Sequence, residues 1–217
     1  MTALKGSVLP PELEEVEDLP SLLREARKED LDITGKRLRN ITISDADASG
    51  LCFRGVSFEN CRFIGWELEK ASFLDVVFRG CDFSNTIFTD SYWNRCRMIS
   101  CKCLGAGLQD ASLQQVSLEN CNFQLSSFDR SRLFAVSLEG CDFTGASMAQ
   151  CRFQDLSLRE NRFLGTVFFR TALRGVDFTR EQLEGIVVSD SFKELAGAIV
   201  TPVQAADLAK LMGLIVQ

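Results

Sequence analysis

The chain has 217 residues, of which 46% are hydrophobic and 25% are charged, and its net charge is −6. It contains no histidine, which excludes Ser–His and Cys–His nucleophile pairs and the zinc sites that combine histidine with cysteine. It also lacks a phosphate-binding glycine motif, so we expect neither an enzyme nor a cofactor or metal site.

Residues 1–30 are expected to form an N-terminal cap segment. They hold 8 acidic and 4 basic residues, a more acidic balance than the rest of the chain. Ser21 to Arg27 follow Pro20 and predict a short helix. We expect this helix to lie over the end of the structure that follows.

Residues 31–190 are an unbroken five-residue repeat. Every fifth residue from Phe53 to Leu183, here called the central residue, is Phe, Leu, Trp, Met or Cys, and a weaker form of the pattern extends from Ile33 to Val188. Two residues earlier lies a mostly small or apolar residue, here called the small position. A period of five fits neither a helix nor a strand, so the chain must turn once per repeat with these two residues facing inward. The pattern predicts a solenoid.

Several of these fives resemble the pentapeptide-repeat family, among them CDFSN at 81–85, VSLEN at 116–120 and CDFTG at 141–145. The resemblance implies an all-β solenoid, a right-handed, four-sided β-helix with four fives in each coil. The 32 fives of residues 31–190 then make about eight coils. Stacked at the inter-strand spacing of ~4.8 Å, they form a rod roughly 38 Å long, with short helical caps at both ends.

Similar residues recur at every fourth five, as such a coil requires. The clearest case is a column of cysteines at five small positions, namely Cys61, Cys81, Cys101, Cys121 and Cys141. One interpretation is a metal or redox site, and the other is that Cys is a small, soft filler of a narrow inward position. The second interpretation is favoured. Trp66 also occupies a small position, so its ring should either turn outward or distort its coil.

Sorting the charges by side of the coil predicts a candidate partner-binding strip. The side that begins at residue 46 in the first coil has a net charge of −4 from seven acidic and three basic residues. Duplex DNA carries one charge per ~1.7 Å of axis, which is a denser array. The strip is either an ordinary solvated face or a contact surface made of Asp47, Glu67, Glu69, Asp90, Asp110, Asp129 and Asp190.

Residues 191–217 are expected to form a C-terminal helical cap and dimerisation element. Thr201, Pro202 and Gln204 supply an N-cap, a proline at the first helical position and a capping box. The segment holds more apolar surface than a small cap needs. The expected dimer interface consists of Leu195, Ile199, Leu208, Leu211, Met212, Leu214 and Ile215.

The tail that runs from Leu195 to Val216 is similar to that of the quinolone-resistance Qnr branch of the family, and the unbroken register resembles its members without projecting loops. This resemblance implies a tail-to-tail homodimer whose rod imitates DNA, binds DNA gyrase and topoisomerase IV, and protects them from quinolones. The alternative is a structural interaction scaffold with another partner. We expect no direct nucleic-acid binding. Because no apolar run approaches ~18 residues and nine thiols favour a reducing compartment, a cytoplasmic protein without a membrane span is expected.

Overall fold

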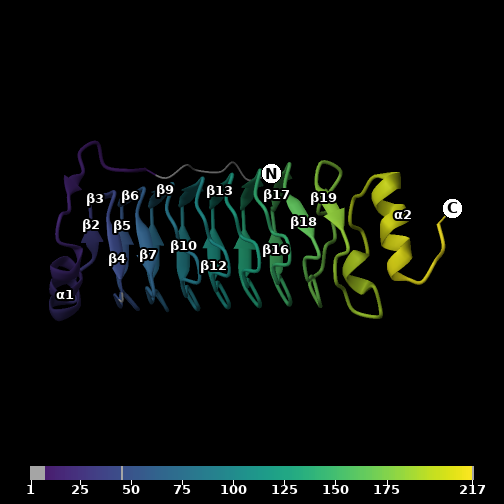
Figure 1. Cartoon of the computed structure of the whole chain (residues 1–217), viewed down its shortest axis with the longest axis horizontal. Helices are drawn as coiled ribbons and strands as arrows, with labels where there is room; N and C mark the ends of the chain where they lie inside the picture. The colour runs from purple at the N-terminus through teal and green to yellow at the C-terminus, as the bar shows by residue number, and fades with distance from the viewer. Residues whose placement is uncertain (1–7, 45, 217) are drawn as a thin grey trace.

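The computed structural model describes residues 8–44 and 46–216 and shows an elongated rod (Figure 1). The rod is a β-solenoid of about eight turns with parallel sheets. Helix α1 lies at one end of the rod and helix α2 lies at the other. The predicted fold class, a β-helix of about eight coils with a helical cap at each end, is confirmed.

The coil has four sides, numbered here by the fives that begin at residues 31, 36, 41 and 46. The second side forms a sheet with the strands β1 (Glu14–Glu15), β3 (Lys36–Arg39), β6 (Ser57–Glu59), β9 (Val77–Arg79), β11 (Arg97–Ile99), β13 (Ser117–Glu119), β15 (Ser137–Glu139) and β17 (Ser157–Arg159). The first side forms a sheet with the strands β2 (Ile33–Thr34), β5 (Cys52–Arg54), β8 (Ser72–Leu74), β10 (Tyr92–Asn94), β12 (Ser112–Gln114), β14 (Arg132–Phe134) and β16 (Arg152–Gln154).

The third and fourth sides are built mainly from single bridges and turns. The third side contains two strand pairs, β4 (Thr42–Ser44) with β7 (Arg62–Ile64) and β18 (Arg162–Leu164) with β19 (Gln182–Glu184). Elsewhere one residue of each five pairs with its equivalent in the next coil, as Lys102 does with Asn122. Their corners are closed by short-range backbone hydrogen bonds, such as that from Thr86 N to Phe83 O at 3.0 Å.

The strand register matches the predicted coil of four fives. Trp93 lies opposite Phe73 on one side and opposite Leu113 on the other. Central residues therefore stack on one another through the middle of the rod, and most of them are buried. The rings of Phe123 and Phe143 stack at a centroid distance of 5.4 Å. This column of apolar side chains is the core.

The last residue of nearly every five adopts a left-handed backbone conformation, which turns the corner. At the Gly80 corner, a neighbouring side chain also occupies the space beside the backbone. A Cβ atom added there would lie 2.6 Å from Oδ1 of Asn60, the corner residue of the preceding coil. Gly140 stands in the same relation to Asn120, at 2.5 Å. As placed here, the side chains of Asn60 and Asn120 occupy the space that a side chain at position 80 or 140 would need.

Trp66 does not turn outward, and this part of the sequence-based expectation is wrong. Its side chain is 1% exposed, and its ring stacks on that of Phe63 at 4.3 Å. The neighbouring residue Glu67 pairs with both adjoining coils, so the coil also keeps its register. The same side of the preceding coil carries Ala46 and Ala48, whose small side chains leave room for the indole.

Helix α1 (Leu19–Glu29) covers the first coil. The side chain of Asp18 accepts a hydrogen bond from Ser21 N at 3.0 Å and caps the helix. Leu23 and Ala26 are buried against the core. The helix predicted from Ser21 to Arg27 is confirmed, and it begins earlier and ends later than predicted.

The C-terminal end contains the 3₁₀ helix η1 (Lys193–Leu195) and helix α2 (Pro202–Leu211). The predicted capping box is present, because Gln204 N donates to Thr201 Oγ1 at 3.2 Å and Thr201 N donates to Gln204 Oε1 at 2.8 Å. The amide of Gln204 also donates to the backbone oxygens of Phe178 and Glu181, at 2.7 and 2.9 Å. These two bonds tie the start of α2 to the last complete coil.

Candidate functional site

The seven residues of the predicted acidic strip lie on the fourth side, on outward or corner positions of successive coils. Asp129 is half-buried, and the other six are exposed. The strip follows the long axis of the rod, because equivalent residues of successive coils are neighbours, as Asp47 and Glu67 are. The seven carboxylates occupy three different positions of the five, so the structure places them on one face of the rod and not in a single column.

Three of the seven carboxylates have partners within the protein. Asp47 pairs with Arg27 of α1 at 2.8 Å, and this hydrogen bond lowers the pKa of Asp47 to about 2. Asp110 pairs with Arg130 of the next coil at 2.7 Å, which also lowers the pKa of Asp110. Asp129 accepts a hydrogen bond from Ala149 N at 3.1 Å. The sequence indicated the charges but not these pairings, which depend on neighbouring coils.

The remaining four residues of the strip make no ion pair among residues 8–44 and 46–216. They are Glu67, Glu69, Asp90 and Asp190. Their exposed charges are available to a binding partner. Three of them, Glu67, Glu69 and Asp90, lie in neighbouring coils towards the N-terminal half of the rod.

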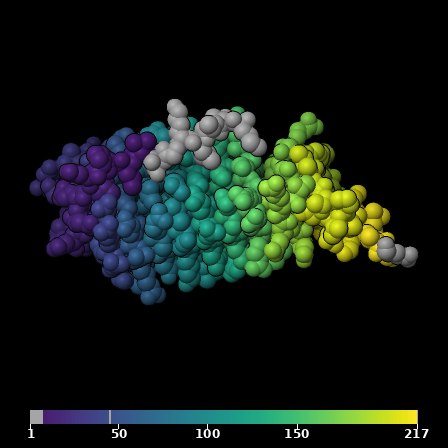
Figure 2. All heavy atoms as spheres, turned by 90° about the horizontal axis from the view of Figure 1, so that it is seen from above, coloured from purple at the N-terminus to yellow at the C-terminus, as the bar shows by residue number. Residues whose placement is uncertain are grey.

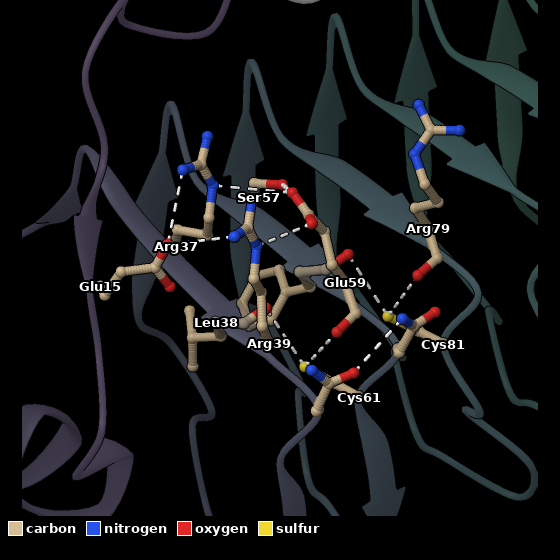
Figure 3. Close-up of polar contacts among 12 residues, drawn as sticks. Glu15, Arg37, Leu38, Arg39, Ser57, Glu59, Cys61, Arg79 and Cys81 are labelled. Carbon is tan, nitrogen blue, oxygen red and sulfur yellow. Dashed lines mark hydrogen bonds and ion pairs between the residues drawn. The ribbon is translucent and has the colours of Figure 1, made fainter.

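The second side carries a charge network that is largely neutralised within the protein (Figure 3). Arg39 Nε lies 2.9 Å from Glu59 Oε2, and Arg37 lies between Glu15 and Glu59 at 3.4 and 3.6 Å. Glu15 belongs to β1, so the network also fastens the N-terminal strand to the edge of the sheet. This surface therefore offers fewer free charges than the strip.

The cysteine column is buried along its whole length, with exposures of 1–2%. Figure 3 shows Cys61 and Cys81 directed at backbone oxygens of the second side, with Cys61 Sγ lying 3.4 Å from Leu38 O and Cys81 Sγ lying 3.5 Å from Phe58 O. No group of three potential metal ligands occurs among the described residues. The filler interpretation is supported, and the thiols also satisfy backbone groups. In the last two coils the small position of this column is occupied by Asn161 and Glu181, which are buried too.

The predicted dimer residues divide into two groups. Leu195 and Leu208 are half-buried and pack against the core of their own chain. The others are exposed, with Ile215 at 89%, and they are Ile199, Leu211, Met212, Leu214 and Ile215. In Figure 2 the rod narrows towards this yellow C-terminal end. An apolar surface is thus present at the place where a tail-to-tail contact was expected.

An apolar corner between the third and fourth sides was not recognised from the sequence. Leu125 is 69% exposed and has a left-handed φ of 58°, whereas the described corners of this column are otherwise Gly or Asn. Ile64 and Ile87 lie near the same edge and are 43% and 44% exposed. Comparing the corner residues of every fourth five would have revealed Leu125 as the one with a large apolar side chain.

No helix in the described parts of the chain is long and apolar enough to cross a membrane.

Two family models match the repeat, one for a pentapeptide repeat region over residues 71–138 and one for eight copies of the pentapeptide repeat over residues 137–180. This chain belongs to the pentapeptide-repeat family. The two matches together span residues 71–180 of this pentapeptide-repeat protein.

Comparison with solved structures finds matches at low sequence identity. Full-length QnrB1, a plasmid-mediated fluoroquinolone resistance protein, is 18% identical, with 96% of this chain and 100% of QnrB1 covered and a TM-score of 0.40. A trypsin-treated QnrB1 variant is 19% identical, with 85% and 92% covered and a TM-score of 0.45. HetL is a pentapeptide repeat protein from the cyanobacterium Nostoc that is involved in heterocyst differentiation regulation. It is 17% identical, with 75% of this chain and 84% of HetL covered and a TM-score of 0.35. A sequence search of curated proteins finds no match.

Proposed function

We propose that this rod binds DNA gyrase or topoisomerase IV in the place of DNA and lessens the action of quinolones on them. It acts in the cytoplasm as a homodimer joined through its C-terminal segment. The observation that carries the proposal is the group of exposed fourth-side carboxylates that make no ion pair in the described structure, above all Glu67, Glu69 and Asp90. The resemblance of the tail and of the loop-free repeat to the Qnr branch supports the same function.

The charge density of the strip limits how closely the rod can imitate DNA. A duplex segment as long as the rod, roughly 38 Å, carries about 22 charges, far more than the strip. Binding therefore depends on the straight shape of the rod and on short-range contacts, with the strip supplying orientation and faster association. The dependence of affinity on salt should accordingly be weaker than that of DNA.

The first test is DNA supercoiling by gyrase from the source organism, titrated with the protein in the presence and absence of ciprofloxacin. We expect rescue of supercoiling from the drug at moderate protein concentration and inhibition at high concentration, since the protein competes with DNA. If neither effect occurs with gyrase or with topoisomerase IV, the proposal is wrong.

The second test assigns the contact to the strip. The triple variant Glu67→Gln, Glu69→Gln, Asp90→Asn should weaken topoisomerase binding and flatten its salt dependence. A matched control neutralises Glu25, Glu29 and Glu184, three exposed acidic residues outside the strip that make no ion pair in the described structure. Equal effects of the two triple variants would show that the strip is not the contact surface.

A structural scaffold for a different protein is the second candidate function. The observation that favours it is Leu125, whose apolar side chain is 69% exposed at a left-handed corner, whereas the other described corners of the column are Gly or Asn. A Leu125→Ser variant that retains full activity in the gyrase assay would separate this corner from the topoisomerase contact. Loss of that activity would place the corner within the same interface.

A further inference from the structure

The side chains of the cysteine column follow a regular hydrogen-bonding rule. Four of the five thiols donate to a backbone oxygen that lies 23 positions earlier in the chain. Cys61 Sγ lies 3.4 Å from Leu38 O, and Cys141 Sγ lies 3.4 Å from Leu118 O. Where the column continues beyond the cysteines, Asn161 Nδ2 donates to the equivalent oxygen, that of Leu138, at 2.9 Å. A donor at the small position of this column therefore recurs from coil to coil.

Members of the column also accept a hydrogen bond from the backbone amide of the equivalent residue in the preceding coil. Cys101 N donates to Cys121 Sγ at 3.4 Å, and Cys141 N donates to Asn161 Oδ1 at 2.9 Å. A thiol and a carboxamide can donate and accept at once, whereas an ionised carboxylate can only accept. Most members of this column thus use both capacities.

Glu181 is the last member of the column and is 6% exposed. Its Oε2 atom accepts hydrogen bonds from Asn161 N at 2.6 Å and from Asn161 Nδ2 at 2.8 Å. Glu181 therefore accepts a backbone hydrogen bond from the preceding coil, as other members of the column do. Its Oε1 atom is buried and has no hydrogen-bond partner in the described structure. The backbone oxygen equivalent to those of Leu118 and Leu138 belongs here to Leu158. A proton on Oε1 would supply the missing donor.

We propose that Glu181 is a neutral carboxylic acid in the folded rod, that it donates a hydrogen bond from Oε1 to the carbonyl of Leu158, and that its ionisation releases the C-terminal end of the rod. Protonated Glu181 then holds the last coil in place, and ionised Glu181 does not. This inference concerns the fold and does not depend on the proposed topoisomerase function.

The surroundings of Glu181 favour the neutral form. Burial is the largest influence and raises its pKa. Hydrogen bonds from Asn161 and from the backbone of Glu160 oppose this rise, and the nearby charge of Asp177 adds a smaller increase. The other charged groups close by in the two coils, on Glu160, Arg162 and Arg180, lie on exposed residues. Helix α2 contributes the uncharged amide of Gln204 on this side.

Glu181 is placed to transmit its charge state to α2. Its backbone oxygen accepts from Gln204 Nε2 at 2.9 Å, and it directly precedes β19, which pairs with β18. A buried carboxylate with an unpaired oxygen costs free energy that opening of this end relieves, because water then solvates the charge. Opening would separate α2 and the apolar tail from the rod.

The stability that Glu181 gives to this end of the rod should fall as pH rises. A carboxyl whose pKa is raised on folding stabilises the fold fully below its unfolded pKa of ~4.3, and this contribution is lost as pH rises through the folded pKa. Glu181→Gln keeps a donor and an acceptor but cannot ionise. For every pH unit between the two pKa values, the opening constant of the native protein should rise about tenfold relative to that of Glu181→Gln.

The experiment compares the native protein, Glu181→Gln and the matched control Glu184→Gln, an exposed residue of the same coil. Hydrogen exchange of β19 and α2 is followed from pH 5 to 9. We expect opening to increase with pH in the native protein and in Glu184→Gln, but not in Glu181→Gln. The carboxyl ¹³C resonance of Glu181 in the native protein gives its protonation directly. Titration near pH ~4.3, or the same pH dependence in all three proteins, would overturn the proposal.

Discussion

Phe123 shows what a central residue contributes to the rod. It is fully buried, it stacks on Phe143 at 5.4 Å, and it meets Phe128 edge to face at 5.4 Å. Its neighbours belong to the same coil and to the next, so the ring fills space between two turns of the chain. The hydrophobic stabilisation of the rod therefore depends on individual rings in successive coils.

Replacing Phe123 by alanine should lower the free energy of unfolding by about 3–5 kcal/mol, because the neighbouring rings cannot close the cavity. Urea unfolding followed by circular dichroism measures the change. The matched control is Leu125→Ala, two residues away and exposed, for which the change should stay within about 0.5 kcal/mol. Similar losses for the two variants would contradict the packing described here.

Eight of the nine cysteines are buried, and Cys52 is half-buried. Burial and the neighbouring Asp32 raise the pKa of Cys52 to about 11. Hydrogen bonding with Cys81 lowers the pKa of Cys61 to about 7, but the Cys61 side chain is 1% exposed, so a reagent cannot reach it. Reactivity towards a thiol reagent needs both access and the thiolate form.

We therefore expect a thiol reagent at pH 8 to modify at most one thiol of the folded protein, and slowly. All nine should react after denaturation, which an absorbance assay of released thiol product counts. Cys52→Ser should abolish the native reaction. Rapid modification of several thiols in the folded state would contradict the buried column.

The two caps differ in how they dock on the coils. Helix α1 buries Leu19, Leu23 and Ala26, whereas α2 has no fully buried residue and contacts the core through Leu208. The first cap is therefore a closed end, and the second leaves apolar surface uncovered. This asymmetry favours association at the C-terminal end only.

Met212→Glu combined with Ile215→Glu should give monomers in light scattering, because two charges would be buried in a tail-to-tail contact. Both residues are exposed, so the coils should keep their stability. Leu208→Glu is the comparison, since it disturbs the packing of α2 on its own chain and should also lower the unfolding midpoint. A dimer that survives the first pair of substitutions would disprove this interface.

The sequence predicted the elements whose signals are local. The period of five indicated the coil, and Thr201, Pro202 and Gln204 indicated the start of α2, because each of these depends on residues adjacent in the chain. It did not distinguish the strand-like sides from the bridged sides, since the same five-residue pattern serves both. The buried position of Trp66 was missed because it depends on small residues of the preceding coil. The pairing of Asp47 with α1 was missed because it joins different elements.

At the scale of the whole molecule, each coil contacts only its neighbours, so stability should vary along the rod. Coils in the middle have two neighbours and bury their central residues completely, as Trp93 and Leu113 show. We expect amides of β10 and β12 to exchange most slowly and those of β2 and β19 to exchange faster. Native-state hydrogen exchange measures this gradient. Equal protection at all positions would mean that the rod opens only as a single unit.

The four-sided coil fixes how the chain can gain or lose residues. Removing one five, such as residues 101–105, would leave every other five intact but would rotate the rest of the rod by a quarter turn. Asp110 would then leave the side that carries Glu67 and Asp90 and lie on the neighbouring side. Removing four consecutive fives would shorten the rod by one spacing of ~4.8 Å and preserve every face. The surface of this protein therefore repeats with a period of four fives, although its core repeats with a period of one.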